Sequence, residues 1–139
     1  MNLPENAAAT ARNVRVVHGA MAAGVIMFAI VAHFVMLPKA HPNGGLADKI
    51  PLLIGISLAA CAISFVFSTR VPRPSPGESA DSFWKRAAPT AQITWAFLEG
   101  AALLGVVAYS LTAAKAEIAV AGLAVLIFVL MNPAYFERR

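Results

Sequence analysis

Charged residues are scarce in this sequence of 139 residues, and they avoid its longest apolar stretches. Asp, Glu, Lys and Arg make up 13% of the chain, about half of the usual quarter, while 59% of the residues are hydrophobic. A soluble domain of this size could not bury that much apolar surface. The composition and the placement of the charges therefore predict an integral membrane protein.

Cysteine is also scarce, because the chain holds only Cys61, inside an apolar segment. A single cysteine makes neither an intrachain disulfide nor a zinc site. The sequence contains no glycine-rich nucleotide cradle after a strand and no nucleophile–base arrangement. The basic residues flank apolar segments instead of forming a face with interleaved aromatics, which argues against nucleic-acid binding. We expect no metal, no cofactor and no enzymatic activity.

Four apolar stretches predict an all-α fold, a membrane bundle of four helices in one domain that covers residues 1–139. The predicted spans are 16–37, 50–69, 91–112 and 116–133. Proline- and glycine-rich segments separate the first two spans and follow the second. The uncharged part of the fourth, 118–131, is short for a crossing, so we expect Lys115 and Glu117 to snorkel outward and extend it. The alternative is a re-entrant segment.

The basic residues predict the orientation. Eight of the eleven lie in the leader, the middle linker and the tail, and three lie in the two hairpin loops. The richer side stays cytoplasmic, so we expect both termini inside. We expect the first dozen residues to form a disordered or surface-lying leader. Trp84, Lys85 and Arg86 have the character of an interfacial anchor before the third span.

An internal repeat is visible when the first span is laid on the third with Gly24 over Gly100. Ala20 then meets Ala96, and His33 meets Tyr109. One interpretation is a duplicated helical hairpin, with both copies in the same orientation. The other is chance similarity among Ala, Gly and Val.

Glu99 is the strongest candidate for a functional residue, because it lies near the middle of the third span. A charged, unpaired carboxylate at that depth costs a few kcal/mol or more, so it must be protonated, paired or facing a polar cavity. We expect it to point into the bundle or an oligomer interface and to be protonated at neutral pH. Gln92 shares its helical face, and Tyr109 lies ten residues later. One interpretation is packing through a hydrogen bond, and the other is a proton or ion site.

Small and hydroxyl residues predict helix contacts. Gly24, Gly100 and Gly105 suit close approach between helices. Ser57 and Ser64 share one face of the second span with Cys61 and Ser68, which predicts a packing seam, or makes one of the two serines the partner of Glu99. His18 and His33 are fifteen residues apart on one helix and cannot share a metal, so we expect interfacial or hydrogen-bonded histidines.

Residues 93–103, Ile-Thr-Trp-Ala-Phe-Leu-Glu-Gly-Ala-Ala-Leu, resemble a segment in a family of small bacterial four-helix membrane proteins of unknown function. The matching positions are Trp95, Glu99, Gly100, Tyr109 and Thr112, whereas Thr94 stands where that family often has a basic residue. This resemblance implies a bacterial cytoplasmic membrane. A fainter similarity joins the chain to the proteolipid ring subunit of rotary ATP synthases. That subunit, however, carries its carboxylate on the second helix of a hairpin.

Together these patterns favour a non-enzymatic accessory or structural membrane subunit. Its expected partners are the lipid bilayer and either other membrane subunits or further copies of itself. The alternative is a proton- or cation-translocating subunit that uses Glu99.

Overall fold

The computed structural model describes residues 7–36 and 47–139, and this part of the chain is helical with no strand. Its long helices are α1 (Ala7–Val31), α2 (Ile50–Arg70), α3 (Ala80–Thr112) and α4 (Lys115–Leu130). A π-helical turn, η1 (Ala32–Met36), continues α1, a 3-10 turn, η3 (Ala47–Lys49), precedes α2, and a short helix, α5 (Pro133–Glu137), follows α4. The predicted turn at 38–45 and the first six residues of the leader lie outside the described residues.

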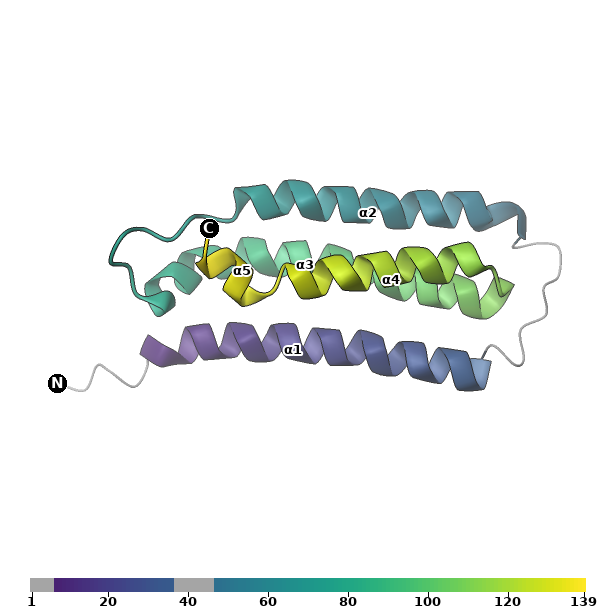
Figure 1. The fold of residues 1–139 in the computed structure, drawn as a ribbon, viewed down its shortest axis with the longest axis horizontal. Coiled ribbons are helices and arrows are strands. Elements are labelled where there is room, and N and C mark those ends of the chain that lie inside the picture. Colours follow the sequence, from purple (N-terminus) through teal and green to yellow (C-terminus); the bar gives the residue numbers. More distant parts are fainter. Residues whose placement is uncertain (1–6, 37–46) are drawn as a thin grey trace.

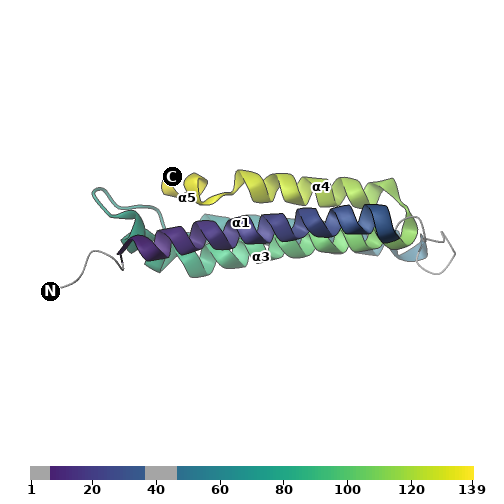
Figure 2. The same cartoon turned by 90° about the horizontal axis from the view of Figure 1, so that it is seen from below.

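The four long helices lie nearly side by side along one axis, with α1 and α2 on opposite sides of the α3–α4 pair (Figure 1). The turned view shows the same lengthwise alignment, with α1 alongside α3 and α4 above them (Figure 2). The start of α1, the 71–79 linker and the C-terminus share one end of the bundle. The η1 turn and the α3–α4 connection share the other (Figure 1). The order along the bundle is therefore up, down, up, down.

Among the residues that the structure describes, three helical segments are long and apolar enough to cross a membrane: Ala9–Met36, Ile50–Arg70 and Ala80–Thr112. Their most apolar 18-residue windows have mean hydropathies of 2.1, 2.4 and 1.5. Only 11% of that window in the first segment is buried and 17% in the second, against 50% in α3. The third helix is thus the centre of the fold, while α1 and α2 turn wide apolar faces outward.

Local sequence signals explain the ends of α3. Ser79 caps its N-terminus by accepting a hydrogen bond from the Ser82 amide, and Asp81 lies in its first turn. At the other end Ala113 adopts the left-handed conformation, with φ of 56°, and its amide donates to the Tyr109 carbonyl at 2.8 Å. This backbone geometry ends a helix and lets the chain reverse directly into α4.

Several predicted boundaries move. The helix α1 begins at Ala7, so the end of the predicted leader is helical, and α3 begins eleven residues before the predicted span at 91. Trp84 therefore lies inside α3, where it is fully buried instead of facing a membrane interface. The second span, predicted at 50–69, differs from α2 by one residue. The fourth helix has 16 residues and ends at Leu130, short of the predicted 133.

The arrangement differs from a duplicated hairpin. In such a fold α1 would pack on α2 as α3 packs on α4. Instead α3 makes the main contacts with each of the other three long helices, and the α3–α4 pair separates α1 from α2 (Figure 1). The match between the first and third spans therefore does not correspond to two equivalent helical pairs.

Candidate functional site

Glu99 is half-buried on α3 and lines a small cavity between α3, α1 and α4. The other walls are apolar, including Val25 from α1 and Val125 from α4. The carboxyl group makes no hydrogen bond or ion pair with any residue in the described part of the chain. Gln92 is exposed and Tyr109 is half-buried, and neither of them contacts Glu99 through a hydrogen bond. The three predicted residues therefore form no shared polar site within this chain.

Glu117 of α4 is a buried carboxyl group, contrary to the prediction from the sequence. Its side chain is 0% exposed, whereas we expected it to snorkel toward the membrane surface. Both carboxyl oxygens are enclosed, and neither has a hydrogen-bond partner among residues 7–36 and 47–139. Glu117 is buried because it lies on the inward face of α4. The other buried residues of that face are Ala121, Ala124 and Phe128. Spacings of four, three and four residues place all four on one side.

The helices α3 and α4 approach each other closely beside Glu117. A Cβ added to Gly105 on α3 would lie 2.9 Å from the Ala121 Cβ and 2.9 Å from the Glu117 carbonyl oxygen. Gly105 therefore lies at a helix contact, as predicted. The prediction for Gly24 and Gly100 is wrong within this chain, because both are exposed and a Cβ there would meet nothing within 4 Å. These two glycines are on outward faces that the other helices do not cover.

The hydroxyl face of α2 is buried against the bundle, as the predicted packing seam requires. Ser57, Cys61, Ser64 and Ser68 are all buried against the bundle. The Ser64 hydroxyl donates to the Cys61 carbonyl and the Ser68 hydroxyl to the Phe65 carbonyl, each at 2.7 Å. The Ser57 hydroxyl oxygen has no partner among the described residues. Neither Ser57 nor Ser64 bonds Glu99, so this face is a packing seam.

Aromatic side chains from α1 and α3 bind carbonyl groups at the C-terminal end of α4. Helix termini leave carbonyl groups without intrahelical partners. Here the His18 Nε2 donates to the Phe128 carbonyl at 3.2 Å, and the Trp95 indole donates to the Met131 carbonyl at 2.7 Å. The His18 ring also stacks on Phe128, with 4.5 Å between centroids. His18 is therefore a hydrogen-bonded core residue, and His33 is exposed in the η1 turn.

Glu137 joins three helices at the same end of the bundle. Its carboxylate accepts from Arg15 of α1 at 2.9 Å and from the Trp84 indole of α3 at 2.7 Å. Arg139 adds a link to α2 by donating to the Ser68 carbonyl at 2.8 Å. These contacts hold the C-terminal segment against the bundle, which is a structural role.

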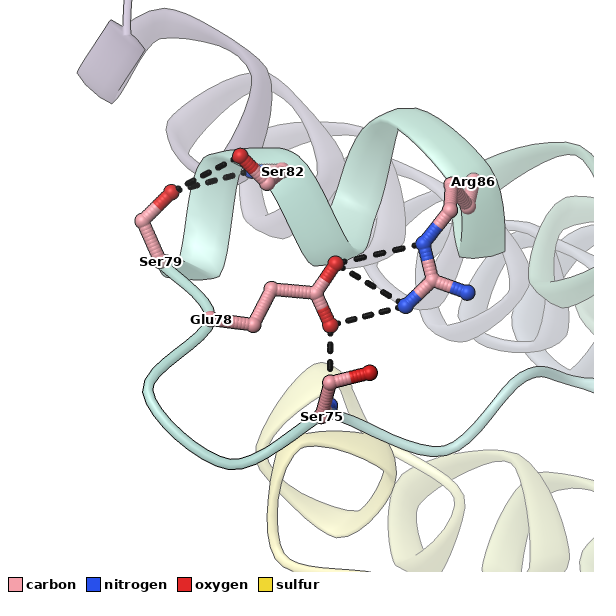
Figure 3. A network of polar contacts seen from close by, with 5 residues as sticks. All are labelled: Ser75, Glu78, Ser79, Ser82 and Arg86. Atoms are coloured by element: carbon pink, nitrogen blue, oxygen red, sulfur yellow. Dashed lines mark hydrogen bonds and ion pairs between the residues drawn. The ribbon is translucent and has the colours of Figure 1, made fainter.

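A second polar network orders the linker before α3 (Figure 3). The Glu78 carboxylate accepts from both Nη2 and Nε of Arg86, with a closest distance of 2.7 Å, and from the Ser75 amide at 2.9 Å. The Ser75 hydrogen bond and the Arg86 guanidinium hold the pKa of Glu78 below its ordinary value of 4.5. The network therefore favours the charged carboxylate and fixes the turn at Gly77, where φ is 77°.

Within the described ranges no group of three His, Cys, Asp or Glu side chains could hold a metal ion. Comparison with protein-family models, with curated proteins and with solved structures finds no match to this chain.

Proposed function

We propose that this chain is a small integral membrane protein, a non-enzymatic accessory or structural subunit whose four long helices all cross the bilayer. The observation that carries the proposal is the outward apolar face of α1 and α2. Large hydrophobic side chains are exposed along both and on the η1 turn that continues α1, among them Met27 on α1 at 66%, Phe34 on η1 at 72% and Phe65 on α2 at 61%. Water would penalise so large a continuous apolar surface, whereas lipid tails would not.

The short fourth helix is compatible with a crossing in this setting. Its 16 residues continue through Met131 and Asn132 into α5, and the polar contacts of Glu137 and Arg139 lie beyond that point. In this proposal the end that holds the start of α1, the 71–79 linker and the C-terminus faces the cytoplasm, because the basic residues concentrate there. The resemblance of residues 93–103 to a segment of small bacterial membrane proteins makes the bacterial inner membrane the expected location.

Alkaline carbonate extraction of cell membranes tests this proposal. We expect the protein to stay in the membrane pellet after the wash and to dissolve only with detergent, because apolar helix faces hold it in hydrocarbon. A peripheral protein from the same cells serves as the control that the wash releases. Recovery of this chain in the supernatant as a soluble, folded protein would overturn the proposal.

The second candidate is a proton- or cation-translocating subunit. Two observations favour it: Glu99 has no hydrogen-bond partner among the described residues, and the enclosed Glu117 carboxyl has none either. Ionisable groups at such positions in membrane proteins often mark ion pathways. This candidate requires proton or cation flux into vesicles that hold the protein, and loss of that flux in a normally folded Glu99→Gln variant. Glu99→Gln with unchanged flux would remove it.

A further inference from the structure

A pocket of about 600 Å³ opens at the end of the bundle that holds the start of α1 and the start of α3. The first turns of α1 form one wall, and the start of α3 forms the other. Arg12 and Arg15 extend into the lining from α1, and Ser79 and Asp81 contribute from α3. Val16 adds an apolar side chain that is 61% exposed. The pocket therefore combines two cations with an apolar edge.

The charge balance of this pocket leaves positive groups available. Arg12 is exposed and makes no hydrogen bond or ion pair in the part of the chain that the structure describes. Arg15 contacts Glu137 through Nη2 alone, and 58% of its side chain is exposed. The one carboxylate in the lining, Asp81, is already engaged by the Thr10 amide and by the Lys85 ammonium, each at 3.1 Å.

The level of this pocket in the proposed bilayer indicates which kind of molecule it would bind. Arg12 and Arg15 lie directly before the apolar stretch that begins at Val16. In a bilayer this is headgroup depth on the side with more basic residues. Arginine pairs well with phosphate because its planar guanidinium offers two parallel donors. The exposed Val16 side chain suits the glycerol and upper acyl region next to such a phosphate.

We propose that this pocket binds the phosphate group of an anionic phospholipid, with Arg12 as the main contact and Arg15 as the second. The inference rests on the proposed membrane location. Basic pockets between helices on the cytoplasmic side commonly hold such headgroups. A lipid fits better than free phosphate because only a lipid would use the apolar edge at Val16.

Native mass spectrometry of the detergent-purified chain tests this inference. Phosphatidylglycerol is titrated against phosphatidylcholine with the same acyl chains, for the wild type, Arg12→Gln and Arg73→Gln. Arg73 is the matched control, because it is exposed in the linker at the same end, carries the same charge and does not line the pocket. We expect Arg12→Gln to weaken phosphatidylglycerol binding at least about tenfold, the effect of losing one charge-assisted hydrogen bond to a phosphate. We expect Arg73→Gln and phosphatidylcholine binding to stay unchanged.

Four other results would each refute a different claim. Equal losses in Arg12→Gln and Arg73→Gln would indicate unspecific attraction and remove the pocket. Inorganic phosphate that displaces phosphatidylglycerol from the wild type but not from Arg12→Gln would show a phosphate site without lipid selectivity. A chain that stays in carbonate-washed membranes yet shows no Arg12 effect would refute only this inference. A chain released by the wash would refute the membrane location itself.

Discussion

Gly105→Ala should lower the free energy of unfolding by about 1–3 kcal/mol, the usual cost of forcing one methyl group into a packed contact. The new methyl would lie 2.9 Å from the Glu117 carbonyl oxygen and 2.9 Å from the Ala121 Cβ. The carbonyl is backbone, so it cannot move without shifting α4. A larger residue, as in Gly105→Leu, should prevent the α3–α4 pair from forming. Unfolding in detergent, followed by circular dichroism, measures both effects.

Gly100→Ala is the matched control, because it makes the same change on the same helix where nothing lies within 4 Å. It should be neutral or stabilising by up to about 1 kcal/mol, since alanine favours a helix over glycine. Equal losses at the two glycines would contradict the observed contact at Gly105. A large loss at Gly100 alone would show that another chain covers that outward face.

Glu117→Met should raise the free energy of unfolding by about 1–3 kcal/mol, the cost that a buried polar group without a partner imposes. Methionine fills a similar volume and removes two oxygens that have no hydrogen bond among the described residues. Glu99→Met is the control and should change the free energy of unfolding little, because the outward part of the half-buried Glu99 side chain meets detergent or lipid in the folded and the unfolded chain alike. The same unfolding assay compares the two variants.

Destabilisation by Glu117→Met would contradict this account. It would mean that Glu117 has a favourable partner in the membrane, such as water or a cation. Glu117→Gln would then separate the cases, because an amide can hydrogen-bond water but lacks the negative charge with which a carboxylate balances a bound cation.

The helices could be predicted from the sequence because apolar runs of this length have few alternatives. The boundaries of α2 were within one residue, since Pro51 and Arg70 mark its ends. The buried face of α2 also followed from the spacing of Ser57, Cys61, Ser64 and Ser68. The ends of α2 and its buried face both follow from residue types and spacings within that helix alone.

The candidate site was harder to predict, because it depends on how each helix is rotated about its axis. Position along the chain singled out Glu99, which is central in its span but only half-buried. Glu117 lies near a helix start, yet its phase with Ala121 and Ala124 turns it inward. Likewise, the sequence identified three glycines but not the crossing point of α3 and α4, which selects Gly105.

The central claim is a membrane bundle in which α4 crosses as the other three helices do, and side-specific labelling of single cysteines tests it most directly. In a Cys61→Ala background, cysteines replace Pro76 in the linker, Ala116 at the start of α4 and Arg138 after α5, all exposed positions. We expect a membrane-impermeant thiol reagent to label Ala116→Cys in intact cells, and Pro76→Cys and Arg138→Cys only after permeabilisation. Labelling of Pro76→Cys and Arg138→Cys from opposite sides would show that α4 does not cross and would contradict the account.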